Sequence, residues 1–221
     1  KATEDLNLVM TSIMIVGVIQ ASSQTNKNNI LFDAVKKYAT GHEVINFGCF
    51  PDDIIKYSYI EMSIEIGILL ASKAVDFVVT GCSSGQGMML ACNNMPGVIC
   101  GYAPTPKDAY LFAQINNGNA ISLPLGEEYT YSGSENCKKT VEMLFYESFG
   151  QGYPKDQAAR KISDAKLLKS VKEKSQVDFI TLLERLDDNL ITKVLQKKNV
   201  VDHVLNNGTD IATINWIKQH I

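Results

Sequence analysis

The sequence predicts an α/β protein in which a five-stranded parallel sheet carries helices on both faces and is followed by an α-helical C-terminal extension. From residue 14 onward, short β-branched runs alternate with stretches in which apolar residues recur at helical spacing. The strand-like runs are apolar throughout, as expected of parallel strands buried on both faces. After residue 152 only helical patterns remain. We therefore expect an N-terminal extension over residues 1–13, an α/β domain over 14–152 and a helical extension over 153–221.

The predicted strands are short and rich in valine and isoleucine. They cover residues 15–19, 44–47, 75–80, 98–102 and 120–123. In an open parallel sheet, ligands bind beyond the carboxyl ends of the strands. The loops that follow these strands therefore form one rim, and the loop after residue 80 is expected at its centre.

The segments between the strands contain helix signals. Residues 30–38 and 60–68 place apolar side chains at helical spacing. Thr105 followed by Pro106 is typical of a helix start, because proline is tolerated at the first helical position. These segments supply the helices that cover the sheet.

Two further patterns predict helices toward the C-terminus. Ser132 and Glu135 resemble a capping box for a helix that runs to Phe149. Apolar residues between 179 and 195 line one face of the C-terminal extension. That face is expected to cover either the sheet or a second subunit.

Composition and charge favour a globular protein that acts on small molecules. Hydrophobic residues make up 45% of the 221-residue chain, charged residues make up 20%, and the formal net charge is −3. No apolar run approaches the roughly 20 residues of a membrane-spanning helix, and no signal-peptide pattern opens the sequence. Lysines are scattered among carboxylates, which argues against nucleic acid as a partner. The five cysteines lack Cys-x-x-Cys spacing, so we expect reduced thiols in the cytoplasm and neither a disulfide framework nor a zinc site.

The segment from Val75 to Ala91 carries most of the functional information. The thiol of Cys82 and the hydroxyls of Ser83 and Ser84 lie in a glycine-rich turn between a predicted strand and a predicted helix. The first backbone N–H groups of a helix lack intrahelical acceptors, and the helix dipole is positive there. The turn is therefore expected to hold an anion and to favour a thiolate at Cys82. This thiol is a candidate nucleophile or proton-transfer base.

The residues of this turn leave two kinds of chemistry open. Gly81-x-Ser83-x-Gly85 fits the nucleophile elbow of a serine hydrolase, whereas the Gly-x-Gly-x-x-Gly order of a dinucleotide site is missing. Nucleophilic catalysis by serine or cysteine needs a histidine partner. The chain's histidines all lie outside the predicted rim, at His42, His203 and His220. A proton-transfer base needs no such partner, and the turn would stabilise the charge that appears when a proton leaves a carbon next to a carbonyl.

Three segments resemble the type B ribose-5-phosphate isomerase and galactose-6-phosphate isomerase family. Residues 76–98 contain Cys-Ser-Ser-Gly-Gln-Gly and then Asn-Asn-Met-Pro-Gly, similar to the family's Cys-Gly-Thr-Gly-x-Gly followed by Asn-Lys-x-Pro-Gly. Residues 41–48 are similar to its Gly-His-Glu-Val-x-Asp-x-Gly, and residues 116–119 to its Asn-Asp-Ala-Asn. The resemblance covers about residues 14–170 with few gaps.

The resemblance implies a Rossmann-like three-layer sandwich and a homodimer or homotetramer with the active site at a subunit interface. It implies aldose–ketose isomerisation through a cis-enediolate, without a metal or another cofactor. Cys82 is then the proton-transfer base, and Ser84 helps ring opening. The other residues that the resemblance places at the substrate are Gln20, Tyr59, Ser83, Gly85, Gln86, Gly87, Asn116, Asn119 and Arg160.

The sequence departs from the family at the groups that open the sugar ring and hold phosphate. The family's Ser-Asp-His after the first strand is Ile19-Gln20-Ala21 here, and its later His-Asp-Pro is Pro104-Thr105-Pro106. The family also has several arginines near its C-terminus. In this sequence only Arg160 lies at a matching position. The expected substrate is therefore a sugar phosphate or a sugar acid. Longer relatives with a similar extension are associated with isomerising 4-deoxy-5-keto-uronates, and a non-catalytic sugar-binding relative is a further alternative.

Overall fold

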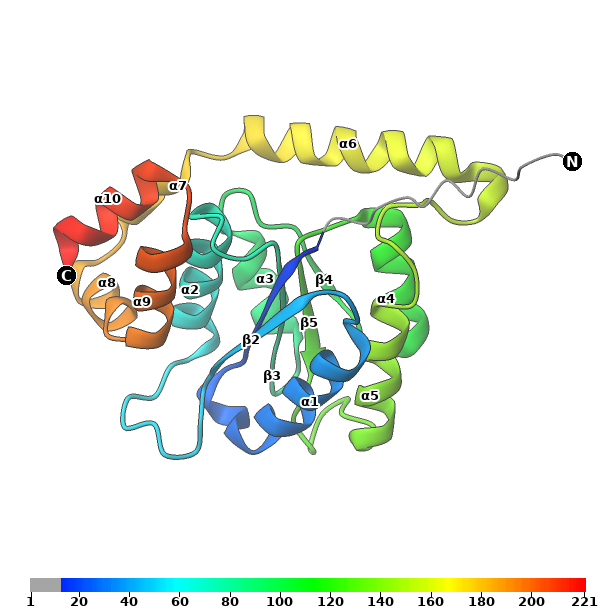
Figure 1. Cartoon of the computed structure of the whole chain (residues 1–221), viewed down its shortest axis with the longest axis horizontal. Helices are drawn as coiled ribbons and strands as arrows, with labels where there is room; N and C mark the ends of the chain where they lie inside the picture. The colour runs from blue at the N-terminus through cyan, green and yellow to red at the C-terminus, as the bar shows by residue number, and fades with distance from the viewer. Residues whose placement is uncertain (1–12) are drawn as a thin grey trace, which may run out of the picture.

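The computed structural model describes residues 13–221, so residues 1–12 of the predicted N-terminal extension lie outside the described part of the chain. Its centre is a parallel five-stranded sheet in the order β2-β1-β3-β5-β4 (Figure 1), which confirms the predicted fold class. The strands are β1 (Ile15–Ile19), β2 (Glu43–Gly48), β3 (Phe77–Cys82), β4 (Cys100–Tyr102) and β5 (Ala120–Pro124).

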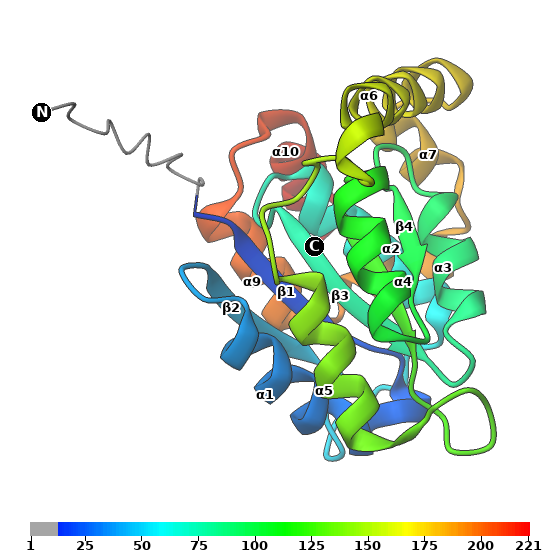
Figure 2. The same cartoon turned by 90° about the vertical axis from the view of Figure 1, so that its right-hand side faces the viewer.

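Helices cover both faces of the sheet, as Figures 1 and 2 show. On one face, side chains of β1, β3 and β5 pack with α1 (Asn28–Tyr38), α4 (Pro106–Leu111) and α5 (Gly133–Leu144). On the other face, the strands pack with α2 (Tyr59–Ala71) and α3 (Gln86–Asn93). The three layers are those of a Rossmann-like sandwich.

The central strand and the helix beside it are buried for the same reason. All six residues of β3 are buried, because β1 and β5 pair with it and helices cover it on both faces. In α2 nearly every residue from Glu61 to Leu69 is buried, because further helices pack on its outer side. Each fully buried Ile or Leu side chain contributes roughly 1.5–3 kcal/mol of transfer free energy. β3 therefore holds the turn that follows it on a rigid support.

The C-terminal extension forms five helices, of which the last four pack with α2 in one apolar core, while the first runs across the top of the molecule in Figure 1. They are α6 (Ala158–Ser175), α7 (Phe179–Arg185), α8 (Asp188–Leu195), α9 (Lys198–Asn207) and α10 (Ile211–His220). The predicted apolar face of the extension thus packs against a helix of the same chain. A Cβ atom added at Gly67 would lie only 2.7 Å from the Cε2 atom of Phe179. Because Gly67 has no side chain, α7 can pack closely against α2.

Several element boundaries differ from the prediction. β4 begins at Cys100, because the side chain of Asn119 accepts a hydrogen bond from the Ile99 backbone N–H (2.8 Å). At α5 the capping-box prediction is wrong: the Ser132 hydroxyl donates to the Thr130 carbonyl oxygen and makes no cap hydrogen bond. The helix also ends at Leu144, short of the predicted Phe149.

The predicted start of α4 is confirmed. Thr105 caps the helix by accepting from the Asp108 backbone N–H, and Pro106 occupies the first helical position. Across residues 13–221, no helix is both long enough and apolar enough to cross a membrane.

Candidate active site

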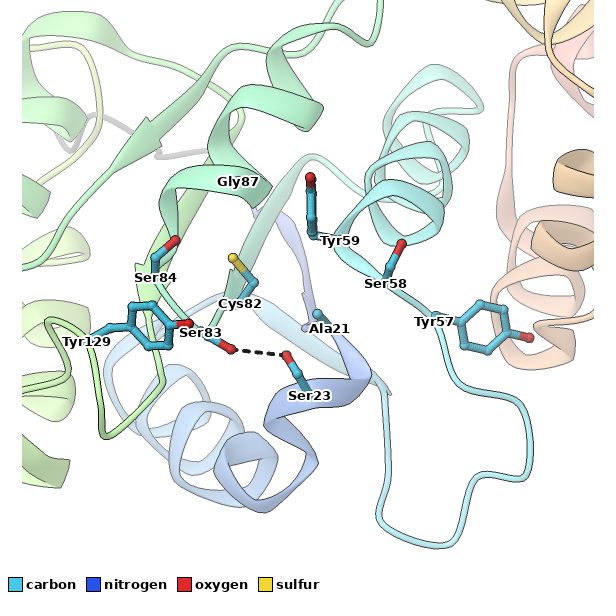
Figure 3. Close-up of a pocket in the computed structure, with 10 residues that line it drawn as sticks. All are labelled: Ala21, Ser23, Tyr57, Ser58, Tyr59, Cys82, Ser83, Ser84, Gly87 and Tyr129. Atoms are coloured by element: carbon cyan, nitrogen blue, oxygen red, sulfur yellow. Dashed lines mark hydrogen bonds between the residues drawn. The ribbon is translucent and has the colours of Figure 1, made fainter.

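A cavity of about 450 Å³ opens at the carboxyl end of β3 (Figure 3). Four segments form it: the loop after β1, the start of α2, the turn after β3 and the loop after β5. Its lining residues are Ala21, Ser23, Tyr57, Ser58, Tyr59, Cys82, Ser83, Ser84, Gly87 and Tyr129. The cavity lies on the rim where ligands of parallel sheets bind.

Cys82 is the last residue of β3, and its side chain is 7% exposed. Figure 3 shows its thiol pointing into the cavity between Ser84 and Tyr59. The backbone around it is fixed by both neighbouring strands: the Ala21 N–H donates to the Gly81 carbonyl oxygen (3.1 Å), and the Leu125 N–H donates to the Cys82 carbonyl oxygen (3.0 Å). The sulfur is thus held at a defined place and is largely shielded from solvent.

The turn after Cys82 has the form of an anion-binding loop. Gly85 adopts a left-handed conformation (φ +76°) directly before α3, which no side chain caps. The Ser122 hydroxyl donates to the Gly85 carbonyl oxygen (2.6 Å), and the Gln86 N–H donates to the Ser84 hydroxyl (3.3 Å). The first backbone N–H groups of α3, which lack intrahelical acceptors, therefore begin at the edge of the cavity.

Ser83 belongs to a small polar network that the sequence analysis did not find. Its hydroxyl accepts from the Gln24 side-chain amide (2.9 Å) and lies 3.4 Å from the Ser23 hydroxyl, the contact drawn in Figure 3. Because Gln24 occupies one lone pair, the Ser83 O–H is free to donate to a ligand. The loop after β1 was expected at the rim, but no local pattern identified Gln24 in it as a partner of Ser83.

The start of α2 contributes three consecutive residues. Ser58 and Glu61 form a capping box, in which the Ser58 N–H donates to the Glu61 carboxylate (2.7 Å). Tyr59 lies over Gly87, with ring carbons 3.5 Å from the position of a Cβ there. Tyr57 turns its ring away from Cys82, toward the C-terminal helices (Figure 3). Of these residues, only Tyr59 and Gly87 were predicted.

Three predicted residues near the turn do not line the cavity. Gln20 is fully buried, where its amide donates to the Cys49 carbonyl oxygen (2.6 Å) and its oxygen accepts from Asn28 (2.8 Å). Its polar atoms therefore hold the loop after β1 to neighbouring segments. Gly85 and Gln86 shape the start of α3 without bordering the cavity.

The last three predicted residues lie at the other end of the sheet. Asn119 precedes β5, whereas Cys82 is paired with Pro124 at the end of that strand, about 16 Å away at the usual rise per residue. Asn116 is exposed beside Asn119, and Arg160 lies at the start of α6, bonded to Asp164 (3.1 Å). One chain therefore does not bring these three residues to Cys82.

The cavity is electrically neutral. None of its ten lining residues carries a charged side chain. The buried cation Lys27 forms an ion pair with Glu127. All three histidines lie within the described residues, and none lines the cavity: His42 accepts from the Met14 N–H, His203 contacts the Ala74 carbonyl oxygen, and His220 contacts the Trp216 carbonyl oxygen. The site offers a thiol, hydroxyls and backbone N–H groups.

Comparisons with known proteins give the family. The family model described as ribose/galactose isomerase matches residues 16–163. The crystal structure of a 4-deoxy-L-threo-5-hexosulose-uronate ketol-isomerase complexed with a tartrate is 33% identical, with a TM-score of 0.88 over 94% of this chain and 99% of that chain. A ribose-5-phosphate isomerase from Vibrio parahaemolyticus is 34% identical, with a TM-score of 0.88 over 95% and 100%.

A ribose-5-phosphate isomerase B from Clostridium thermocellum shares the fold at 21% identity, with a TM-score of 0.59 over 74% of this chain and 100% of that chain. No curated protein matches. The family match contains Cys82 and every segment that lines the cavity. The chain therefore belongs to the ribose/galactose isomerase family and is a sugar isomerase that interconverts aldoses and ketoses.

Proposed function

We propose that this isomerase acts on an unphosphorylated sugar acid, a 4-deoxy-5-keto-uronate, and that Cys82 is its proton-transfer base. The observation that carries the proposal is the neutral lining of the cavity. A phosphate dianion is usually held by arginine or lysine. A single carboxylate needs less positive charge than a phosphate dianion, and the hydroxyl groups of the cavity can donate to it.

The proposed reaction moves one proton between two neighbouring carbons and one between their two oxygens, and it consumes no other reactant. The Cys82 thiolate takes a proton from the carbon next to the substrate's carbonyl, and the electron pair of the broken C–H bond forms the enediolate. The N–H groups of residues 83–87 donate to the enediolate oxygen as its negative charge develops. The thiol then returns the proton to the neighbouring carbon, while the hydroxyl proton passes from the second oxygen to the first, which leaves the carbonyl one position along the chain.

The comparison with solved structures supports an acid substrate. The ketol-isomerase at 33% identity is described as acting on a 4-deoxy hexosulose uronate, although the ribose-5-phosphate isomerase is equally similar. The cationic side chains that could bind a phosphate already have other partners in this chain. Lys27 pairs with Glu127, and Arg160 bonds Asp164 and Gln157. The charge of the site thus favours the uronate.

A direct comparison of substrates tests this preference. We expect kcat/KM for the 4-deoxy-5-keto-uronate to exceed that for ribose 5-phosphate by at least about 100-fold, because the cavity offers phosphate no charged partner, and a hydrogen bond to a charged group contributes about 1.5–3 kcal/mol. Solvent deuterium should enter the uronate at the carbon next to its carbonyl. Turnover of ribose 5-phosphate alone would contradict the proposed substrate, and binding without deuterium exchange would indicate a non-catalytic relative.

We also propose that the active site is completed by a second copy of the chain. Asn116 is exposed at the far end of the sheet and borders a hollow with Tyr102 and Leu168. On α6, Leu167, Leu168 and Val171 are apolar and exposed. A homodimer would cover these side chains and carry Asn116 of one copy to the Cys82 cavity of the other.

Mixing two inactive variants tests the shared site. Cys82→Ala and Asn116→Ala homodimers should each be impaired. After unfolding and refolding together, half of the dimers are mixed, and each mixed dimer holds one intact site, so about a quarter of the sites recover. Activity no greater than the average of the two separate variants would place Asn116 outside the active site.

Two further assignments rest on the cysteines and histidines. A serine hydrolase centred on Ser83 lacks support, since no histidine borders its cavity. A cytoplasmic location is supported by the five cysteines, which are all free and buried.

A further inference from the structure

A second cavity of about 400 Å³ lies between the loop before α2 and the corner where α8 meets α9. Residues 52–55, Tyr57 and residues 196–199 line it, and we call it the Lys197 cavity. Tyr57 borders both this cavity and the Cys82 cavity. In Figure 3 the Tyr57 ring points away from Cys82 and toward the C-terminal helices that border the Lys197 cavity.

Lys197 is the unusual group in this cavity. Its side chain is only 5% exposed, yet it forms no hydrogen bond or ion pair with any described residue. Its Nζ atom lies 5.6 Å from the centre of the Tyr57 ring. An ammonium group that is largely shielded from solvent gains from an added acceptor, so a ligand that supplies one to Lys197 would be favoured.

The start of α9 adds further donors at the same place. The helix has ten residues, begins directly after Lys197, and has no side-chain cap. The Lys198 N–H already donates to the Gln196 carbonyl oxygen (2.9 Å) and the Val200 N–H to the Lys197 carbonyl oxygen (3.0 Å), so the helix offers the cavity the Asn199 N–H and the positive end of its dipole. A buried lysine and an uncapped helix start together favour a carboxylate.

Two more polar groups lie around Lys197. Glu65 is fully buried with neither carboxylate oxygen bonded, and burial raises its pKa well above the usual range while Lys197 opposes that shift. Neither Glu65 oxygen forms a hydrogen bond with Lys197, so the lysine keeps its N–H donors for a ligand. Burial raises the pKa of Tyr57 to about 12, which keeps its hydroxyl a donor.

The opposite wall is acidic and accepts hydroxyl donors. Asp53 is half-buried, and one of its oxygens accepts from the Phe50 N–H (2.8 Å). Its remaining acceptor capacity suits a ligand that carries hydroxyl groups. A bare anion such as phosphate would gain nothing from this wall.

We propose that the Lys197 cavity is a second binding site that takes a small hydroxylated carboxylate. The carboxylate contacts Lys197 and the start of α9, and the ligand's hydroxyl groups contact Asp53 and Tyr57. The site would be coupled to the Cys82 cavity, because the Tyr57 N–H donates to the Ser22 hydroxyl (2.8 Å) and the Ser22 N–H donates to the Tyr57 carbonyl oxygen (3.0 Å). This binding is independent of which sugar the Cys82 cavity isomerises.

Hydrogen exchange measured by mass spectrometry on the full chain tests the site, with D-galacturonate as the probe. We expect backbone amides of residues 196–201 to exchange several-fold more slowly with saturating D-galacturonate, and to be unaffected by uncharged D-galactose. Lys197→Met should remove this protection, whereas Lys198→Met, which alters the exposed neighbouring lysine, should retain it. Lys197→Arg should keep at least part of the protection.

Protection confined to residues 81–87, or unchanged in Lys197→Met, would overturn the proposal. If Lys197→Met does not fold, as judged by its melting curve, Lys197→Arg and the comparison of D-galacturonate with D-galactose on the unaltered chain decide the matter. Equal protection by both sugars would also overturn it. Turnover of the keto-uronate is assayed in the same samples, so its absence with intact protection at 196–201 would count only against the proposed substrate.

Discussion

Replacing Cys82 with alanine is expected to abolish isomerisation while leaving substrate binding in place. The thiol of Cys82 points into the cavity, and the hydroxyls and N–H groups proposed to bind the sugar belong to other residues. Loss of a general base typically lowers the rate by about 10²–10⁴-fold. NMR of deuterium incorporation at the substrate carbon measures the loss, and calorimetric titration measures the retained binding.

A remote buried cysteine provides the control. Cys137 lies on α5, on the opposite face of the sheet, and burial raises its pKa to about 11, so it stays a thiol at neutral pH. Cys137→Ala should keep wild-type turnover. It should lower the free energy of unfolding by about 1 kcal/mol, because the packing contacts of the sulfur are lost. Turnover that survives in Cys82→Ala would mean that another group is the base.

The elements that the sequence predicted best are those whose burial is set by local composition. The run ending in β3 is apolar on both faces, which only a central parallel strand requires. The apolar residues of α2 are too many for one stripe, consistent with a helix covered on two sides. In contrast, the capping-box pattern at Ser132 does not form a cap because both side chains make other local contacts: Ser132 bonds Thr130, and Glu135 pairs with Lys138.

The candidate site divides in the same way. The turn from Cys82 to Gly87 was predictable because thiol, hydroxyls and glycines are adjacent in the sequence. Gln24 and Tyr129 come from loops that only tertiary structure brings to Cys82, and no periodic pattern indicates which of their side chains point inward. The resemblance named Asn116, but one chain leaves it at the far end of the sheet, where only a second copy would make use of it.

Replacing Gly85 with alanine is expected to disrupt both stability and activity. Gly85 has φ +76°, and a Cβ there would stand 2.8 Å from the Leu123 carbonyl carbon and 2.8 Å from the Pro124 nitrogen. Because both atoms belong to the backbone of β5, the turn itself must move. We expect a loss of about 3–4 kcal/mol, the sum of left-handed strain and overpacking. The N–H groups of residues 83–87 would move with the turn, so kcat should fall as well.

Gly97 separates the two causes. Its φ of +77° nearly equals that of Gly85, but a Cβ there would meet no atom within 4 Å. Gly97→Ala therefore carries only the backbone strain, about 1 kcal/mol, and should leave kcat unchanged. Urea unfolding of both variants measures the difference, and turnover of the keto-uronate measures its effect on catalysis. Equal losses of stability, with kcat intact in both, would mean that β5 yields to the added methyl group and does not fix the turn proposed to hold the enediolate.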